Sequence, residues 1–167
     1  AGQLLIEVHH ISLNPGESHM AIEGHLPPNL VLGWEAAGVV VAAARNHGES
    51  GRTSGEYGPA LGDRVITYGR NGGWAQRRTA TVANLAIVPD YVDLAAAAAL
   101  PVAACTALGA LRAAGPILGK RVLVTGASGG VGRFAVQLAT IGGAHVIASV
   151  GSELRGKGLL DLGAHEV

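Results

Sequence analysis

A glycine-rich turn between an apolar run and an amphipathic helix constrains the fold of this chain more than any other feature. The run Arg-Val-Leu-Val-Thr at residues 121–125 is typical of a fully buried strand. The turn follows directly as Gly-Ala-Ser-Gly-Gly-Val-Gly at residues 126–132. Apolar residues then recur at helical spacing, which predicts a helix packed on a sheet: Val131, Phe134, Ala135, Leu138 and Ala139.

A second strand is predicted soon after this helix. Gly142 and Gly143 end the helix, and residues 145–150 form another short apolar run. Ser152 can cap a short helix after that run, and Gly163 can stop it. The order strand, helix, strand, helix defines a right-handed crossover unit of a parallel sheet.

The turn also indicates a chemistry, because a strand, a glycine-rich turn and a helix in this order are typical of dinucleotide sites. Glycines let the backbone turn tightly and approach a pyrophosphate, whose charge then lies at the helix N-terminus. A purely structural tight turn is the alternative. The predicted cofactor-binding residues of the turn are Ala127, Ser128, Gly129, Gly130, Val131 and Gly132.

The end of the second strand favours NADPH over NADH. Sites for NAD usually place Asp or Glu there, about 20 residues past the glycines, to accept from the ribose hydroxyls. This chain has Ser152 instead, and Arg155 one helical turn further on can pair with a 2′-phosphate. The alternatives are that Ser152 is only a helix cap and Arg155 only a solvated charge, and Glu153 would repel a phosphate if it pointed inward.

The first part of the chain reads as β structure and forms a separate domain. Leu4, Ile6 and Val8 alternate with residues of the opposite face, and further short apolar runs predict strands at residues 31–32, 38–44, 63–68 and 79–87. Their spacing predicts a compact, partly closed β domain, with a long surface loop over residues 45–60. The predicted domains are 1–93 and 94–167.

Composition excludes several classes of partner. The 12 Lys and Arg balance the 12 Asp and Glu, so no basic surface indicates binding to nucleic acid or to an anionic membrane. The uncharged stretch 94–111 is mostly Ala and contains Pro101, which predicts a close-packed helix pair rather than a membrane span. Cys105 is the only cysteine, so the chain can form no intrachain disulfide, and this favours a cytoplasmic location. Cys105 is expected to be a small buried residue.

Several ordered motifs are spread along the chain: Ser-Leu-Asn-Pro at 12–15, Leu-Gly-Trp-Glu-Ala-Ala-Gly-Val-Val at 32–40, Gly-Asp-Arg-Val at 62–65, Gly-Trp-Ala-Gln at 73–76, Ala-Leu-Pro at 99–101, Thr-Ala at 106–107, the segment 122–139, and Leu-Gly-Ala-His-Glu-Val at 162–167. With them the chain resembles the zinc-independent quinone oxidoreductases, the zeta-crystallin-like type of the medium-chain dehydrogenase/reductase superfamily. The resemblance implies an α/β protein in which a GroES-like β-barrel domain precedes the first β-α-β-α of a Rossmann domain. It also implies a longer parent chain, cut at both ends.

The resemblance bears on metal and on catalytic residues. Zinc-containing members carry a Cys in the region of Asn14 and a His-Glu pair at Trp34-Glu35, so the chain is expected to bind no zinc. The resemblance places Asn14 and Thr106 beside the nicotinamide and the substrate. His19 stands where relatives often have a Tyr, and could donate to a substrate oxygen. The alternatives are a turn-making Asn14, a helix-packing Thr106 and a surface His19.

The activity implied is hydride transfer from NADPH to a small-molecule acceptor that needs little polarisation, a quinone or an α,β-unsaturated carbonyl. The resemblance further implies a homodimer of the full-length protein. Two alternatives stay open. One is a non-catalytic pseudoenzyme that binds NADPH, and the other is a truncated interaction module that pairs through an exposed sheet edge.

Overall fold

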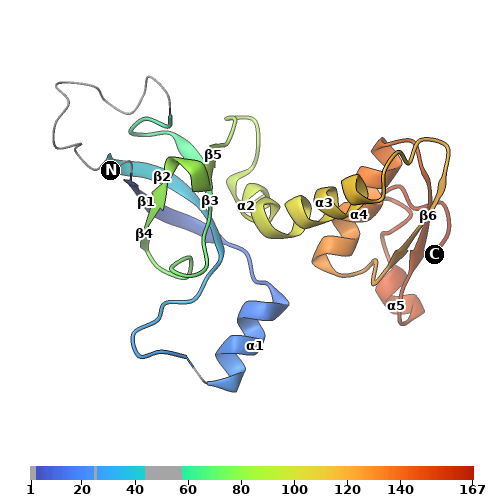
Figure 1. Ribbon diagram of the computed structural model, residues 1–167, viewed down its shortest axis with the longest axis horizontal. Helices are drawn as coiled ribbons and strands as arrows, with labels where there is room; N and C mark the ends of the chain where they lie inside the picture. Colours follow the sequence, from blue (N-terminus) through green and yellow to red (C-terminus); the bar gives the residue numbers. More distant parts are fainter. Residues whose placement is uncertain (1–2, 25, 44–57) are drawn as a thin grey trace. The chain divides into compact units, whose positions relative to one another are not determined.

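The structure is a computed structural model and describes residues 3–24, 26–43 and 58–167. The chain divides into two compact units, Ala1–Pro101 and Val102–Val167, whose elements Figure 1 labels in chain order. Most of the loop predicted at 45–60 lies outside the described residues.

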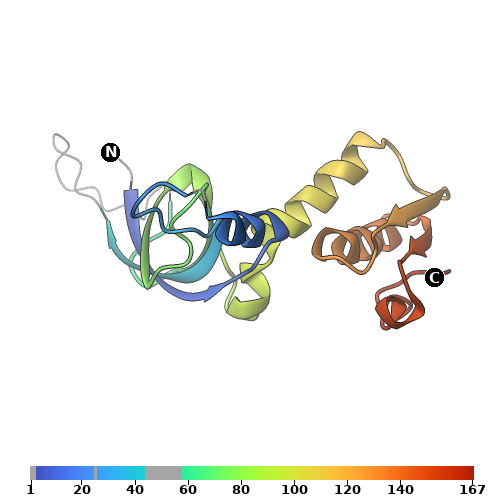
Figure 2. The ribbon, with the colours of Figure 1, turned by 90° about the horizontal axis from the view of Figure 1, so that it is seen from below.

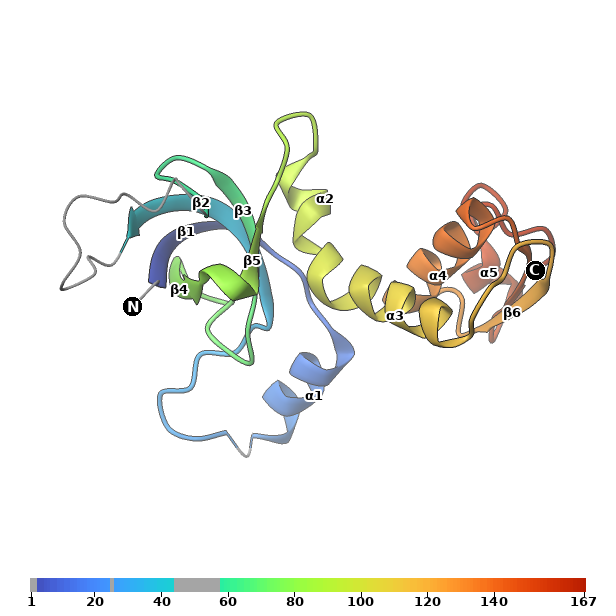
Figure 3. The same ribbon diagram turned by 45° about the horizontal axis from the view of Figure 1, so that its top comes forward.

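The first unit is built on a curled antiparallel sheet, which Figure 3 shows from its open side. Neighbouring strands lie in the order β4-β1-β2-β3-β5 and pair antiparallel. The curled sheet matches the predicted partly closed β domain. Its strands are β1 (Gln3–Ile11), β2 (Glu35–Ala43), β3 (Arg64–Tyr68), β4 (Arg77–Thr81) and β5 (Leu85–Ile87).

Alternating side chains fill the inside of this sheet, as the period of β1 predicts. Leu4 and Ile6 are buried together with Val40 and Val65 of neighbouring strands. Gly38 lets β2 approach β1 closely, because a Cβ atom there would lie 1.9 Å from the Glu7 carbonyl oxygen. Burial of this apolar face stabilises the sheet by about 25 cal/mol for each Å² removed from water.

Two predicted strands of this unit differ from the structure. Residues 31–32 form no strand, because their carbonyls accept from a separate loop: Gly72 donates to Val31 (2.7 Å) and Trp74 donates to Leu32 (2.8 Å). The predicted strand 79–87 is interrupted by the 3₁₀ turn Val82–Asn84, which separates β4 from β5. Leu32 is buried, but Val31, Val82 and Ile87 are exposed, so the apolar runs predicted neither the burial of each residue nor its backbone partner.

Helix α2 (Leu94–Ala98) packs on the sheet, and further helical segments connect elements along the chain. Helix α1 (Pro15–Glu23) follows β1, and α2 begins after Asp93, whose side chain accepts from the Ala96 amide (2.9 Å). A π-helical turn (Leu100–Ala104) leads to α3 (Cys105–Ala113), so helical segments lie on both sides of Pro101, as predicted. Their close packing on each other stays a prediction. Because α2 packs against Ala37 and Val88 of the first unit, the chain divides after Pro101, later than the boundary predicted after Asp93.

The second unit begins a parallel α/β sheet. Strands β6 (Arg121–Thr125) and β7 (His145–Ser149) pair in parallel, and α4 (Gly130–Ile141) packs on one face of them (Figure 2). The core between them holds Val124, Val136, Val146 and Leu159. Glu166 forms an isolated parallel bridge with Ile147 of β7. The crossover unit predicted from the sequence is thereby confirmed.

The final helix is shorter than predicted. Helix α5 (Glu153–Gly156) ends well before Gly163, and turns follow it instead. Gly163 adopts a left-handed conformation with φ 101° within these turns. Among the residues that the structure describes, no helix is long and apolar enough to cross a membrane.

Candidate functional site

The glycine-rich turn lies between the carboxyl end of β6 and the start of α4. The Ala127 amide donates to the Ser149 carbonyl at the end of β7 (3.1 Å), which joins the turn to both strands. The first hydrogen bond of α4 runs from the Arg133 amide to the Gly129 carbonyl (2.9 Å). The amides of Gly130, Val131 and Gly132 precede that bond, so they belong to the unpaired first turn that favours an anion.

Close packing at Gly132 keeps this turn tight. A Cβ atom at this position would lie 2.4 Å from the Gly126 carbonyl oxygen and 2.7 Å from the Ala127 Cα atom. Gly132 and Ala127 are buried, whereas Gly129, Gly130 and Val131 are exposed. A tight backbone with exposed amides at a helix start fits the diphosphate of a dinucleotide.

The two residues predicted to select the 2′-phosphate lie beyond the carboxyl end of β7. Ser152 occupies the N-cap position of α5, and its hydroxyl makes no capping hydrogen bond. The Arg155 amide donates to the Ser152 carbonyl (3.0 Å), so both residues belong to one turn, and both are exposed. The structure thus brings Ser152 and Arg155 to the same end of the sheet as the glycine-rich turn.

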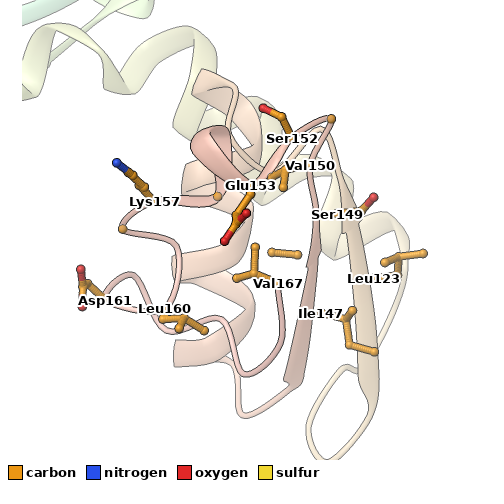
Figure 4. A pocket seen from close by; sticks show the side chains of 14 residues that line it. Leu123, Ile147, Ser149, Val150, Ser152, Glu153, Lys157, Leu160, Asp161 and Val167 are labelled. Carbon is orange, nitrogen blue, oxygen red and sulfur yellow. The ribbon is translucent and has the colours of Figure 1, made fainter.

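A hollow of about 870 Å³ adjoins Ser152 on the second unit. Figure 4 shows apolar side chains on its walls, from Leu123 and Ile147 on the strands to Val167 at the chain end. Ser152 and Lys157 line the hollow, whereas Arg155 does not. Lys157 is a cation beside this site that was not predicted from the sequence as a cofactor-binding residue. Its position two residues after Arg155 could have indicated it.

A second polar cluster surrounds Asn14 in the first unit. The Asn14 side-chain Nδ2 atom donates to Glu17 Oε2 (3.0 Å) and to Glu35 Oε1 (2.8 Å). Glu17 and Glu35 are fully buried, and Asn14 is 8% exposed. Glu17 also accepts from the backbone amides of Asn14 (2.9 Å) and Trp34. Sequence reasoning singled out Asn14 but missed Glu17.

His19, the second predicted catalytic residue, and Thr106, predicted to bind the cofactor, both lie on exposed surfaces. His19 is on α1, with its side chain 72% exposed and its Nε2 atom 2.9 Å from Glu23 Oε1. Thr106 is exposed on α3 of the second unit. Cys105 beside it is also exposed, so the expectation that it is a buried core residue is wrong.

A buried cation adds to the electrostatics of the first unit. Arg78 of β4 is 7% exposed and donates to the carbonyls of Trp34 (3.4 Å) and Asn71 (3.1 Å). Burial lowers the pKa of this guanidinium. Backbone carbonyls thus hold Arg78 between Trp34, which directly precedes Glu35 of β2, and Asn71 in the loop before β4.

An ion-pair cluster lies at the opposite end of the second sheet from the glycine-rich turn. Glu166 Oε1 is 2.8 Å from His145 Nε2 and accepts from Arg121 (3.1 Å). The hydrogen bond with His145 is the main reason that the pKa of Glu166 is lowered, and the charge of Arg121 adds to it. The described residues contain no group of three or more His, Cys, Asp or Glu side chains placed to hold a metal ion.

Comparison with known proteins places the first unit in a family. Residues 1–90 match the alcohol dehydrogenase GroES-like domain. The chain is 38% identical to lovastatin diketide synthase of Aspergillus terreus over 143 residues, which are 85% of this chain and 6% of that protein. It is 34% identical to human quinone oxidoreductase over 170 residues, which are 99% of this chain and 49% of that enzyme.

Solved structures extend the similarity across both units. A mycobacterial protein solved in complex with NADPH matches with a TM-score of 0.84 and 32% identity, over 99% of this chain and 50% of that one. The chain spans about half the length of human quinone oxidoreductase and of this structure. The resemblance deduced from the motifs is confirmed: the chain belongs to the alcohol dehydrogenase GroES-like family and, within the medium-chain dehydrogenase/reductase superfamily, to the quinone oxidoreductase type.

Proposed function

We propose that the chain belongs to an NADPH-dependent, zinc-independent oxidoreductase that transfers hydride to a quinone or an α,β-unsaturated carbonyl. The tight turn at Gly132, with exposed amides at the start of α4, carries the proposal. The similarity to human quinone oxidoreductase and to a protein solved with NADPH supports the choice of cofactor and acceptor.

Each predicted site residue has a role in this proposal. The first-turn amides of α4 bind the diphosphate, with the turn residues Ala127 to Gly132 shaping the backbone around it. Ser152 and Arg155 bind the 2′-phosphate, because a hydroxyl and a guanidinium both donate to phosphate oxygens. NADPH, when bound, supplies the hydride. Asn14, His19 and Thr106 are proposed to border the nicotinamide and the substrate, with the roles that the resemblance gives them.

Zinc independence is supported by the residues around Asn14. A carboxamide stands where zinc-containing relatives have a thiolate, and its nitrogen is held by Glu17 and Glu35. Zinc sites in enzymes are built from Cys, His and carboxylate side chains. Without a Lewis acid, the acceptor must be one whose carbonyl needs little polarisation, which favours quinones and conjugated carbonyls.

A second acceptor is favoured by the similarity to a polyketide-type synthase. The chain is more similar to lovastatin diketide synthase, at 38% identity, than to human quinone oxidoreductase, at 34%. A synthase that assembles acyl chains has a use for a reductase acting on α,β-unsaturated thioesters. An enoyl thioester is also a conjugated carbonyl, so the same hydride chemistry serves both acceptors.

The test is NADPH oxidation by the full product of the reading frame, with a panel of quinones, enones and enoyl thioesters, with and without a metal chelator. The proposal predicts turnover with at least one of these acceptors that the chelator leaves unchanged. Chelator-sensitive turnover would contradict zinc independence. NADPH binding without turnover on the whole panel would indicate a pseudoenzyme instead.

A further inference from the structure

The carboxamide of Asn14 is held between two fully buried carboxylates that come from different elements. Its Nδ2 atom lies 3.0 Å from Glu17 Oε2, on the first turn of α1, and 2.8 Å from Glu35 Oε1, at the start of β2. Both Glu17 and Glu35 have no exposed surface. Two sequence-distant segments therefore converge on one amide group.

This arrangement fixes which way the amide points. An amide NH₂ group has two N–H donors, and here each donor has a carboxylate oxygen as its acceptor. Rotating the amide by half a turn would place the oxygen Oδ1 against both carboxylates, which accept and do not donate when ionised. The orientation with nitrogen inward is the one that satisfies all three side chains.

Glu17 is itself held firmly, so the orientation does not depend on one contact. Its Oε2 atom accepts from the Asn14 backbone amide (2.9 Å) as well as from the side chain, and its Oε1 atom accepts from the Trp34 amide. The aromatic ring of Trp34 lies against Gly16, next to Glu17 in α1. Buried hydrogen-bonded networks of this kind hold their members in a single arrangement.

We propose that Glu17 and Glu35 are positioning residues that make Asn14 a hydrogen-bond acceptor toward the bound ligand and never a donor. Both N–H bonds of the amide are occupied, so Oδ1 is the group that Asn14 can offer. A carbonyl oxygen has two lone pairs, so it can take a ligand N–H or O–H even while it faces the first-turn amide of Glu17 in the capping box of α1. A hydrogen bond to the substrate carbonyl therefore comes from a residue other than Asn14.

This inference rests on the proposed function, and its test uses the full product of the reading frame. Glu35→Met removes the acceptor while keeping the buried volume, and Glu35→Gln keeps an oxygen that can accept from Asn14. Thr67→Val is the matched control, because the buried Thr67 hydroxyl donates to the Ala36 carbonyl (3.1 Å) and its loss perturbs the same sheet without reaching Asn14.

A misoriented amide is expected to lower kcat more than it changes the KM for NADPH, because a small misplacement at the reacting end can reduce the rate by up to about a hundredfold. We expect Glu35→Met to lower kcat at least about tenfold, and Glu35→Gln and Thr67→Val to stay within about threefold of the parent. A Glu35→Met kcat equal to that of Thr67→Val, or a Glu35→Gln kcat as low as that of Glu35→Met, would overturn the proposal.

A second measurement does not depend on activity. Solvent exchange of the Asn14 side-chain NH₂ protons, followed by NMR, should be slow for both protons in the parent and in Thr67→Val, and faster for one of them in Glu35→Met. Slow exchange in an inactive parent would mean that the proposed function fails while the positioning network stands. Fast exchange of both protons in the parent would overturn the network itself.

Discussion

Asn14 shows how a residue predicted from a motif acquires its physical meaning from its neighbours. The turn before Pro15 and the resemblance both drew attention to Asn14, and neither indicated that Glu17 and Glu35 hold its amide. Glu17 is three residues away in sequence, at the spacing of a capping box, and that spacing was the available signal. Glu35 could not be paired with Asn14 from sequence, because the contact depends on how β2 and α1 meet.

Replacing Asn14 with Ala should strongly destabilise the first unit. The change removes the amide that donates to both buried carboxylates. Removing one partner of a buried charged group lowers the free energy of unfolding by about 3 kcal/mol or more. Asn84→Ala, at an exposed position, should change the free energy of unfolding by less than about 0.5 kcal/mol. Urea denaturation of both variants checks this, and equal stabilities would contradict the assigned burial of the Asn14 cluster.

At the scale of elements, the sequence predicted the second unit better than the first. The run 121–125 and the stripe on α4 gave β6 and α4 almost to the residue, because an apolar strand and an amphipathic helix each have a strong local pattern. The prediction that this strand is fully buried is wrong, since Leu123 is 62% exposed and Val124 alone is buried. The segment 31–32 was equally apolar, yet its hydrogen-bond partners come from residues 72–74 rather than from a strand. Long-range backbone pairing of that kind leaves no local pattern to read.

Gly132→Ala tests the tight packing between β6 and α4. The added Cβ atom would lie 2.4 Å from the Gly126 carbonyl oxygen, and overpacking of this kind costs roughly 1–3 kcal/mol. Gly130→Ala is the matched control on the same helix, because its Cβ atom meets Ala103 at an ordinary 3.7 Å. Chemical denaturation should show a loss of stability for Gly132→Ala and none for Gly130→Ala. A stable Gly132→Ala would argue against the tight turn.

The ion pairs at the amino ends of β6 and β7 predict how stability depends on pH. The folded pKa of Glu166 is lowered below the value of 4.5 that it has without partners, so its ionised form stabilises the folded unit above that value. This contribution is lost as the pH falls from 4.5 through the lower folded pKa. Glu166→Gln should flatten the acid limb of a plot of unfolding free energy against pH. An unchanged acid limb would show that the contacts with His145 and Arg121 do not form in solution.

For the whole molecule, the cofactor-binding residues are the part of the site that could be predicted from the sequence in most detail. The glycine-rich turn and the Ser152 turn lie at the same end of the second sheet, as a parallel β-α-β unit requires. The environment of Lys157 could not be predicted, because the hollow it lines is formed by the strand face and by the turns after α5.

Replacing both Ser152 and Arg155 with Ala should reduce the preference for NADPH over NADH by about ten- to a hundredfold, the range expected when hydrogen bonds to a charged group are lost. The ratio of the two dissociation constants, measured by titration, checks this. Lys157→Ala is the comparison, because Lys157 lines the hollow and Arg155 does not. A preference that survives in the double variant and disappears in Lys157→Ala would reassign the 2′-phosphate to Lys157.

The central claim is that this family member carries hydride from NADPH to a conjugated acceptor. The most direct measurement follows a deuterium label from the nicotinamide C4 position of NADPH into the product, using the full product of the reading frame and each acceptor that is turned over. With deuterium at the transferred C4 position, we predict that each turnover leaves the oxidised cofactor without the label and places one deuterium on the β-carbon of a reduced enone or enoyl thioester. A hydroquinone keeps no label, because a hydrogen delivered to a quinone oxygen exchanges with water. A reduced enone or thioester that carries no deuterium on its β-carbon would contradict the claim.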